Sequence, residues 1–460
     1  MKLIKGLIKF IPKPSAIKWL IVYIFIVTLT FVSAKAEAKK ISFIRDTEIE
    51  HILRTYATPI FQVAGLEPSA INIYLVKDKA LNAFVAGGQK LFLNTGLLMR
   101  SETAGQIIAI IAHETGHISG GHLSGIRDAM KNSSAASILA SILGGLASMG
   151  GYSKVGSAIA VGGKGMSTRN YLQYSRTQEG SADAAALRFL EQTGQSSIGM
   201  LSFFKILGDQ ELLSARRQDP YYRSHPLTRE RINTVRAFMK RSKYTEKPDP
   251  PGFIQSHARM KAKLRAFINP PSRTLLTYKK DDKRVEARYA RAIAYYRIPK
   301  LTPALALIDG LINDYPTDPF FQELKGQILF ENGNIDESLP FYEKAVLLGQ
   351  GSHLLHRALG RVLIETGNPA LLQKAIKNLN IAINSDKSDP FTWRLLGTAY
   401  GKAGKLGKSS LALAEEALLN RKPADAKFHS ERAASLFEEG TADWLQAMDI
   451  LQTLKNKKPK

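Results

Sequence analysis

The 460-residue sequence contains no cysteine, and this absence excludes several kinds of site at once. Disulfide bridges, zinc sites built on thiolates, cysteine nucleophiles and a lipid-modified N-terminal cysteine all require that residue. Long hydrophobic runs are also scarce. An uncharged apolar run of 14 residues, 19–32, is shorter than the ~20 residues that a spanning helix needs, and no strong spanning segment follows it. Any metal site must therefore rely on the nine histidines and on carboxylates.

The composition is that of a folded protein with a strong excess of positive charge. Hydrophobic residues make up 44% of the chain and charged residues 23%, and the formal net charge is +24. The length predicts two or three domains. The sequence contains no nucleic-acid-binding motif, so we expect no nucleic-acid partner. Contact with anionic lipid headgroups at a membrane surface fits the basic charge better.

The N-terminus has the order of a secretory signal peptide. Residues 1–18 contain five lysines and no acid, residues 19–32 are apolar, and the small-residue sequence Ser33-Ala34-Lys35-Ala36 follows. We therefore predict a signal peptide over 1–36, cleaved after Ala36, and a periplasmic protein. The alternative is an uncleaved membrane anchor.

The rest of the chain divides into two regions. Strand-like and helical patterns mix over 37–272, a linker is predicted over 273–284, and 285–456 is helical and repetitive. Gly326, Gly360 and Gly397 are 34 and 37 residues apart, which resembles the helix–turn–helix period of tetratricopeptide repeats. Such units stack into a solenoid with a surface for a partner protein. The alternative is ordinary packing of helical hairpins.

The strongest chemical signal is the sequence His113-Glu114-Thr115-Gly116-His117, near the end of a helical pattern that begins at about Ser101. Residues four apart share one face of a helix, so both imidazoles can reach one ion. Glu114 then projects beside that ion and can accept a proton from water. We predict one zinc ion per chain, bound by His113 and His117.

The third ligand decides which kind of zinc site this is. A histidine six residues after His117 would give a zinc site with three histidine ligands, but position 123 is Leu. His122 is one residue too early, and we interpret it as a residue beside or outside the site. The later sequence Glu179-Gly180-Ser181-Ala182-Asp183 offers Glu179 for the ion and Asp183 to orient a ligand imidazole. The alternative is a solvated acidic pair on a surface helix.

Two histidines and one carboxylate leave a coordination position open, which is typical of a catalytic zinc site. Glu114 is the predicted general base. His225 is predicted either to donate a hydrogen bond to the developing oxyanion or to occupy the open zinc position at rest. The alternative is that His225 has no catalytic role and only precedes Pro226 at the start of a helix. Arg176, three residues before Glu179, is predicted to orient the carboxylates.

Three motifs together resemble a known family. Their order, His113 to His117, Gln178 to Asp183 and Ser224-His225-Pro226, is similar to that of the gluzincin metalloproteases that include the CAAX prenyl proteases and the heat-shock membrane proteases. Those relatives span membranes several times. The predicted leader and repeats make this chain more similar to a periplasmic branch. The resemblance implies an α+β zincin-like domain, mainly helical with a small sheet, followed by an all-α repeat solenoid.

The same resemblance implies a function and partners. It implies a zinc endopeptidase in quality control and assembly of outer-membrane β-barrel proteins, with unfolded or stalled barrels as substrates and the assembly machinery bound by the repeats. The alternative from another class is a chaperone or adaptor in which the repeats carry the activity and the protease site is mostly latent. A multi-spanning prenyl-protein protease is disfavoured, because no strong spanning helices follow the leader.

A hairpin is expected to present the substrate to the zinc. Residues 71–77 alternate as a strand, and two more strands flank Gly87-Gly88. Proteases of this type hold an extended substrate along an edge strand through backbone hydrogen bonds. The alternative is a purely structural hairpin. The edge residues predicted to face the substrate are Ala83, Phe84, Val85, Leu91, Phe92 and Asn94.

One uncharged stretch remains open to three interpretations. Residues 133–152 are rich in Ala, Ser, Gly and Leu, and residues 155–163 continue in the same way. We favour a helical flap near the zinc cleft. Contact with a membrane surface and a true membrane span are the two alternatives, and the glycines and serines weaken the second.

Overall fold

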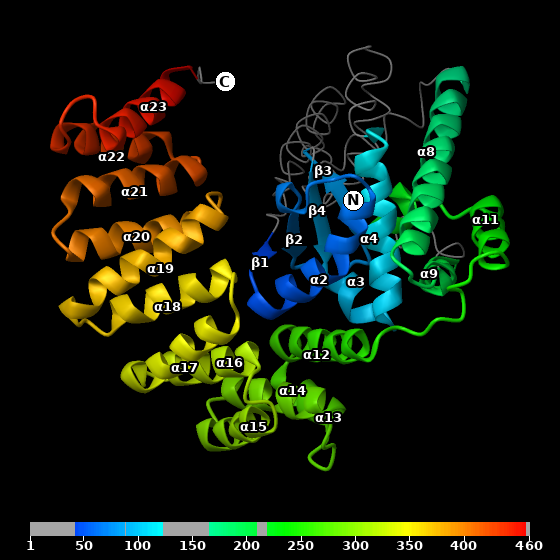
Figure 1. Cartoon of the computed structure of the whole chain (residues 1–460), viewed down its shortest axis with the longest axis horizontal. Helices are drawn as coiled ribbons and strands as arrows, with labels where there is room; N and C mark the ends of the chain where they lie inside the picture. The colour runs from blue at the N-terminus through cyan, green and yellow to red at the C-terminus, as the bar shows by residue number, and fades with distance from the viewer. Residues whose placement is uncertain (1–41, 88, 123–164, 209–218, 457–460) are drawn as a thin grey trace, which may run out of the picture. The chain divides into compact units, whose positions relative to one another are not determined.

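A computed structural model of the protein describes residues 42–87, 89–122, 165–208 and 219–456. The predicted leader and the predicted flap lie outside these residues. The first half of the described chain is mainly helical with one small sheet, and the second half consists of helix pairs (Figure 1), which confirms the predicted fold class. Within the described ranges, no helix has both the length and the apolar character needed to cross a membrane.

The first half contains four strands and the helices that surround them. The strands are β1 (Phe43–Ile44), β2 (Asn72–Val76), β3 (Ala83–Ala86) and β4 (Lys90–Asn94). The helices are α2 (Thr47–Val63), α3 (Thr95–Arg100), α4 (Ala104–Ser119), α8 (Gly165–Gln192), α9 (Ile198–Gly208), α10 (Pro220–Ser224), α11 (Arg229–Met239) and α12 (Pro251–Ile268), with the 3-10 helix η2 (Pro68–Ala70).

The strand order in the sheet is β1-β2-β4-β3. The predicted hairpin of β3 and β4 is present and antiparallel, but β4 also pairs in parallel with β2. The prediction that both hairpin strands form the substrate edge is therefore wrong for β4. The residues of β4 concerned are Leu91, Phe92 and Asn94, which lie inside the sheet, whereas Ala83, Phe84 and Val85 lie on the edge strand β3.

Packing of the sheet against helices forms the core of the first half. Alternate residues of a strand point to opposite faces, and the inward residues Leu91 and Leu93 of β4 are completely buried. Helix α4 contributes Ile107, Ile108 and Ile111 to the same core. This apolar stripe fixes the orientation of α4, and so decides where the side chains of its last two turns point.

Helix α12 is shared by the two halves of the chain. Met260 and Leu264 of α12 belong to the core of the first half, while Ala262 and Ala266 belong to the core of the first helical repeat. The segment predicted as a linker, 273–284, differs from a free linker because it includes most of a further helix, α13, which packs against α12 and α14.

The second half consists of antiparallel helices joined by short turns. These helices are α13 (Pro271–Thr277), α14 (Val285–Arg297), α15 (Leu301–Asp314), α16 (Pro319–Glu331), α17 (Ile335–Leu348), α18 (His353–Glu365), α19 (Leu372–Ser385), α20 (Pro390–Lys402), α21 (Leu406–Leu419), α22 (Pro423–Leu436) and α23 (Ala442–Asn456). The 3-10 helix η4 (Pro369–Leu371) occupies the three-residue insertion that interrupts the repeat period.

The repeated glycines explain the period of the second half. A methyl group added at Gly326, Gly360 or Gly397 would lie 2.8, 2.6 or 3.0 Å from the nearest side-chain atom of the paired helix. Carbon atoms in ordinary contact are about 3.5–4.0 Å apart, so a larger residue would have to displace the facing side chain or the helix that carries it.

Candidate metal centre

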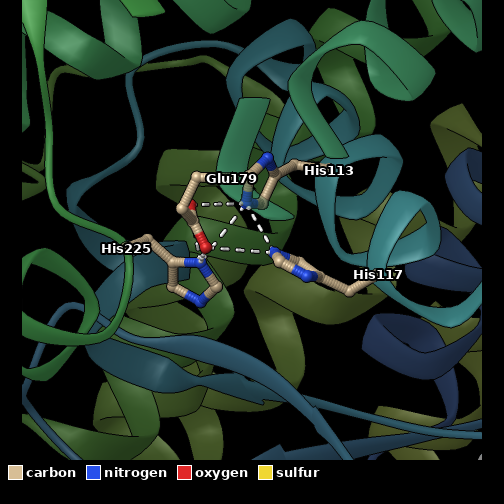
Figure 2. A group of neighbouring side chains, drawn as sticks. All are labelled: His113, His117, Glu179 and His225. Carbon is tan, nitrogen blue, oxygen red and sulfur yellow. Dashed lines mark hydrogen bonds and ion pairs between the residues drawn. The ribbon is translucent and has the colours of Figure 1, made fainter. Parts of the chain in front are cut away.

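Helix α4 places both histidines of the HExxH sequence on one buried face (Figure 2). The helix begins after Thr103, whose side-chain oxygen accepts a hydrogen bond from the backbone N–H of Gln106. His113 and His117 are 2% and 8% exposed, and their Nε2 atoms are 3.1 Å apart. Two turns of one helix thus deliver two imidazole nitrogens to a single point.

Helix α8 brings a carboxylate to the same point. Glu179 Oε2 lies 3.4 Å from His113 Nε2, and Glu179 Oε1 lies 3.3 Å from His117 Nε2. Figure 1 shows α4 and α8 side by side, and their approach is close because Gly116 faces Ala182. A Cβ atom at position 116 would lie 2.8 Å from the Ala182 carbonyl oxygen. Gly116 therefore sets the distance between the two helices at the site.

His225 joins the cluster from the end of the short helix α10. Its Nδ1 lies 3.0 Å from Glu179 Oε1 and 3.3 Å from His113 Nε2. The ring is 7% exposed and stacks on Tyr221, with ring centroids 4.5 Å apart. Three helices, remote in sequence, thus supply four groups whose ligand atoms all lie within 4.8 Å of one another.

This donor set fits a zinc ion. Imidazole nitrogen and carboxylate oxygen bind zinc at about 2.0–2.2 Å, so two ligand atoms of a tetrahedral site lie roughly 3.3 Å apart. Five of the six pairs among His113, His117, Glu179 and His225 have contacts of 3.0 to 3.4 Å, and all the ligand atoms lie within 4.8 Å of one another. The four side chains surround a space of the right size, with the atom types that zinc prefers.

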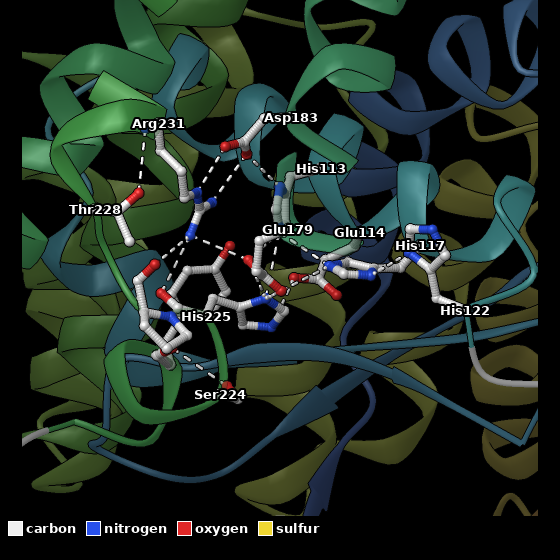
Figure 3. Close-up of polar contacts among 12 residues, drawn as sticks. His113, Glu114, His117, His122, Glu179, Asp183, Ser224, His225, Thr228 and Arg231 are labelled. Atoms are coloured by element: carbon white, nitrogen blue, oxygen red, sulfur yellow. Dashed lines mark hydrogen bonds and ion pairs between the residues drawn. The ribbon is translucent and has the colours of Figure 1, made fainter. Parts of the chain in front are cut away.

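Asp183 and Arg231 hold the ligands in place (Figure 3). Asp183 Oδ1 lies 2.8 Å from His113 Nδ1, the ring nitrogen that faces away from the cluster. Arg231 donates from Nε and Nη2 to the two oxygens of Asp183, at 2.6 and 2.9 Å. Its Nη1 lies 3.0 Å from Glu179 and donates to the Pro226 carbonyl at 2.9 Å. One guanidinium therefore connects both carboxylates with the His225 segment.

Sequence reasoning missed Arg231 and assigned its role to Arg176. The structure leaves Arg176 exposed on α8, about two turns or ~10 Å along the helix from Asp183. Arg231 is 5% exposed on α11, and four residues later Val235 is fully buried on the same face. An arginine in the apolar stripe of a short amphipathic helix was the signal that could have identified it.

In the absence of a bound metal ion, burial and neighbouring charges shift the pKa values of the cluster. Burial alone lowers the pKa of His113, but its hydrogen bonds to Asp183 and Glu179 outweigh burial and raise that pKa to about 10. Burial also lowers the pKa of His117, and there the protonated His113 adds to the effect. Burial raises the pKa of Glu179, but the charge of His225 and hydrogen bonds from His113, His117 and His225 outweigh burial and hold that pKa well below its ordinary value.

His122 lies beside the cluster rather than in it. Its Nδ1 is 2.9 Å from Nδ1 of His117, the nitrogen on the far side of that ring from the other ligands. Burial lowers the pKa of His122 to about 4, so this imidazole is neutral at pH 7. A neutral ring can accept a hydrogen bond from His117 and thereby orient it.

Glu114 occupies the position next to the four ligand atoms. It is fully buried, and no described residue donates a hydrogen bond to either of its carboxylate oxygens. His225 Nε2 lies 3.6 Å from Glu114 Oε1. The edge strand is near: α4 packs against β3, and the backbone N–H of Tyr221 donates to the Leu81 carbonyl just before β3. A buried carboxylate without hydrogen-bond donors suits a group that takes its proton from a bound reactant.

Comparisons with known proteins agree with this site. Residues 44–239 match the family model described as Peptidase family M48. The chain is 21% identical to the "Beta-barrel assembly-enhancing protease" of Yersinia pestis, over 83% of this chain and 78% of that protein. It is 27% identical to the "Metalloprotease LoiP" of Escherichia coli (strain K12), over 42% of this chain and 71% of that protein.

A comparison with solved structures also gives matches to part of the chain. The TPR protein YrrB, described as having an unusual peptide-binding site, matches 41% of this chain and 93% of its own, with 17% identity and a TM-score of 0.29. The repeat architecture rests on the helix pairs and glycine contacts described above.

Proposed function

Because residues 44–239 are a metalloprotease domain of peptidase family M48, we propose that this protein is a zinc-dependent endopeptidase acting on outer-membrane β-barrel proteins in the periplasm. The name of the Yersinia pestis relative, which spans most of the chain, supports that substrate class. The secretory pattern of residues 1–36 supports the location. Cleavage after Ala36 removes six lysines and no acid, and the remaining net charge of +18 suits peripheral contact with anionic membrane surfaces.

The catalytic part of the proposal depends on one observation: Glu114 lies beside the group of His113, His117, Glu179 and His225, whose ligand atoms converge on one point. His113, His117 and Glu179 would hold one zinc ion, with Asp183 and Arg231 fixing the ligands. When bound, zinc supplies a Lewis acid that polarises the substrate carbonyl and lowers the pKa of water to about 7.

The residues of the chain perform the proton transfers. Glu114 accepts a proton from the attacking water at one carboxylate oxygen and passes it to the leaving amine nitrogen. Its burial and the lack of competing donors keep those oxygens available. An imidazole N–H of His225 donates a hydrogen bond to the carbonyl oxygen as negative charge develops there.

His225 has a second role in the proposal. Its Nδ1 is close enough to the other ligand atoms to complete a four-ligand site. Closed sites of that kind are structural, whereas catalysis needs an open position. With His225 as the fourth ligand the enzyme is latent, and activity requires this imidazole to leave the cluster for its hydrogen-bonding role.

Two surfaces bind macromolecules in this proposal. The edge strand β3 holds an unfolded, extended substrate by backbone hydrogen bonds beside the zinc. The repeats bind substrate or the assembly machinery. A cavity of about 380 Å³ supports such docking. It is lined mainly by α19, α20, α21 and α23, and it includes Asn384, Trp393 and Tyr400.

Glu114→Gln tests the enzymatic proposal, with Glu230→Gln as the matched control. Glu230 is exposed on α11 beside Arg231, so its change removes the same charge without entering the site. We expect both variants to retain about one zinc per chain, and Glu114→Gln to lose at least ~100-fold in degradation of an unfolded outer-membrane protein. Wild-type protein without zinc, or an active Glu114→Gln variant, would overturn the proposal.

A chaperone or adaptor is the second candidate, and the position of His225 in the ligand group favours it. If that ring keeps the protease closed, the repeats carry the function. The test is complementation in the native host. Survival of the phenotype in Glu114→Gln, together with its loss in Trp393→Ala on the repeat surface, would establish the adaptor function instead.

A further inference from the structure

Four aromatic rings cross the whole sheet on the face opposite the core. Phe43 lies on β1, Tyr74 on β2, Phe92 on β4 and Phe84 on β3. Phe43 is 49% exposed and the other three are half-buried, whereas the residues that alternate with them along β3 and β4 are buried in the core. Neither the zinc ligands nor the proposed mechanism uses this row of rings.

The strand register makes the row continuous. Tyr74 pairs with Phe92, and Phe92 pairs with Phe84, so these three residues stand opposite one another across three strands. The Tyr74 and Phe92 rings are stacked with centroids 5.0 Å apart, and the Phe92 and Phe84 rings are stacked at 4.8 Å. These distances are close to the spacing of neighbouring strands, which is about 4.7–4.9 Å.

The row ends at an unpaired edge. Among the described residues, β3 has a strand neighbour on one side only, and Phe84 is the last ring of the row. A strand added beside β3 would lie one strand spacing further out. Its side chain opposite Phe84 would point to the same face and reach the exposed side of that ring.

We propose that Phe84 is a specificity-determining residue, which selects substrates carrying an aromatic side chain at the position opposite it when they pair with β3. The proposal rests on the proposed function, because it takes β3 as the strand that holds the substrate. The incoming ring extends the three stacked rings of Tyr74, Phe92 and Phe84 by a fourth, at the spacing that these rings already have.

This selection narrows the substrate class to strands that carry aromatic residues on one face. Strands of outer-membrane β-barrels have that pattern, because their lipid-facing residues alternate with lumen-facing ones and the band is flanked by girdles of aromatic residues. An unfolded barrel strand therefore combines a backbone able to pair with β3 and a ring able to stack on Phe84.

The geometry predicts both the size and the position of the preference. A pair of aromatic rings contributes binding free energy beyond that of its buried area. This extra free energy gives a preference of about two- to tenfold in kcat/KM for an aromatic over an aliphatic residue. Alternate residues of a strand face opposite ways, so the preference should fall on one position relative to the cleaved bond and be absent at its immediate neighbours.

Quenched fluorescent decapeptides in one polar host sequence test the proposal with the full-length, zinc-loaded protein. A single Phe, or a single Leu for comparison, is moved through the peptide, and kcat/KM and the cleaved bond are measured. The Phe/Leu ratio at the preferred position is the readout, in wild type and in Phe84→Leu, Phe84→Tyr and Phe43→Leu. Phe43→Leu makes the same change at the other end of the row. Melting temperature and zinc content establish that each variant is folded.

We expect a Phe/Leu ratio of about two to ten in wild type. It should persist in Phe84→Tyr and Phe43→Leu and fall to about one in Phe84→Leu. A parallel measurement, fluorescence anisotropy of the same peptides with the Glu114→Gln variant and with Glu114→Gln combined with Phe84→Leu, reports binding without cleavage.

The outcomes separate this inference from the proposed function. Cleavage without an aromatic preference, or a preference that survives in Phe84→Leu, overturns the inference and leaves the endopeptidase intact. Aromatic-selective binding that depends on Phe84, without cleavage by wild type, supports the inference and overturns the endopeptidase. Peptides that are neither cleaved nor bound overturn both.

Discussion

Replacing Gly116 with alanine should disrupt the zinc site by moving two helices apart. Gly116 is the residue before His117, and it contacts the backbone of Ala182 on α8. A Cβ atom at position 116 would lie 2.8 Å from the Ala182 carbonyl oxygen and 3.0 Å from its Cα. The opposing atoms belong to helix backbone and cannot rotate away, so the helices themselves must separate.

The required movement can be compared with what the metal tolerates. Ordinary contact distances of about 3.5 Å require a separation of roughly 0.5–0.7 Å, whereas zinc–ligand distances hold within about 0.2 Å. Glu179 lies one turn before Ala182 and would move with it. Overpacking costs about 1–3 kcal/mol, but alanine gains about 1 kcal/mol over glycine inside a helix. Stability without zinc should therefore change by only about 0–2 kcal/mol, while zinc affinity falls by about tenfold or more.

Gly180→Ala is the matched control, because Gly180 lies on α8 beside Glu179 but is exposed and has no atom within 4 Å of an added Cβ. It should keep the zinc affinity and gain up to about 1 kcal/mol. Chelator competition measures the affinity, and thermal unfolding with and without zinc measures the stability. Wild-type zinc affinity in Gly116→Ala, or equal losses in both variants, would refute the reasoning.

Three further predictions follow from the same structure. Asp183→Asn removes the carboxylate that orients His113 and should weaken zinc binding about 10–100-fold in chelator competition; an equal loss in Glu230→Gln would contradict this. Removing zinc with a chelator should lower the melting temperature, and zinc but not magnesium should restore it; at a free zinc concentration 1,000 times Kd the stabilisation is about 4 kcal/mol. Burial lowers the pKa of His257 from 6.5 to about 4, so below pH 6.5 the unfolded chain binds more protons than the folded one and stability falls as the pH falls. The contribution of His257 to the loss between pH 7.5 and pH 5 should be about 2 kcal/mol in urea unfolding, and His257→Gln, which keeps a hydrogen-bond donor toward Ser101, should reduce the pH dependence by about that amount if the reasoning holds.

Much of the candidate site could be predicted from the sequence because its spacing is local. His113 and His117 are four residues apart on a helix, and Glu179 and Asp183 repeat that spacing on a second helix. Local periodicity also predicted the repeats, since each glycine contact is made within one helix pair. These signals depend on neighbours within a turn or within a single hairpin of helices.

Features that depend on pairing between distant segments could not be predicted in this way. The interior position of β4 follows from its parallel pairing with β2, and an alternating pattern does not specify which strands become neighbours. Strand β1 has only two residues and shows no period at all. Arg231 contacts carboxylates about 50 residues earlier in the chain, so its role appears only when α8 and α11 are packed together.

The ligands differ in how firmly the fold holds them, and this difference bears on the choice between protease and adaptor. His113, His117 and Glu179 lie within long helices that touch backbone to backbone at Gly116. His225 instead follows a helix of only five residues, and the Tyr221 ring and an Arg231 contact to its carbonyl at 3.3 Å hold it. Because a catalytic zinc site needs one open position, the ligand that leaves must be the one whose movement disturbs the least packing. By that criterion we propose His225 as the mobile ligand, and the conditions that free it would decide whether the repeats serve an active protease or act alone.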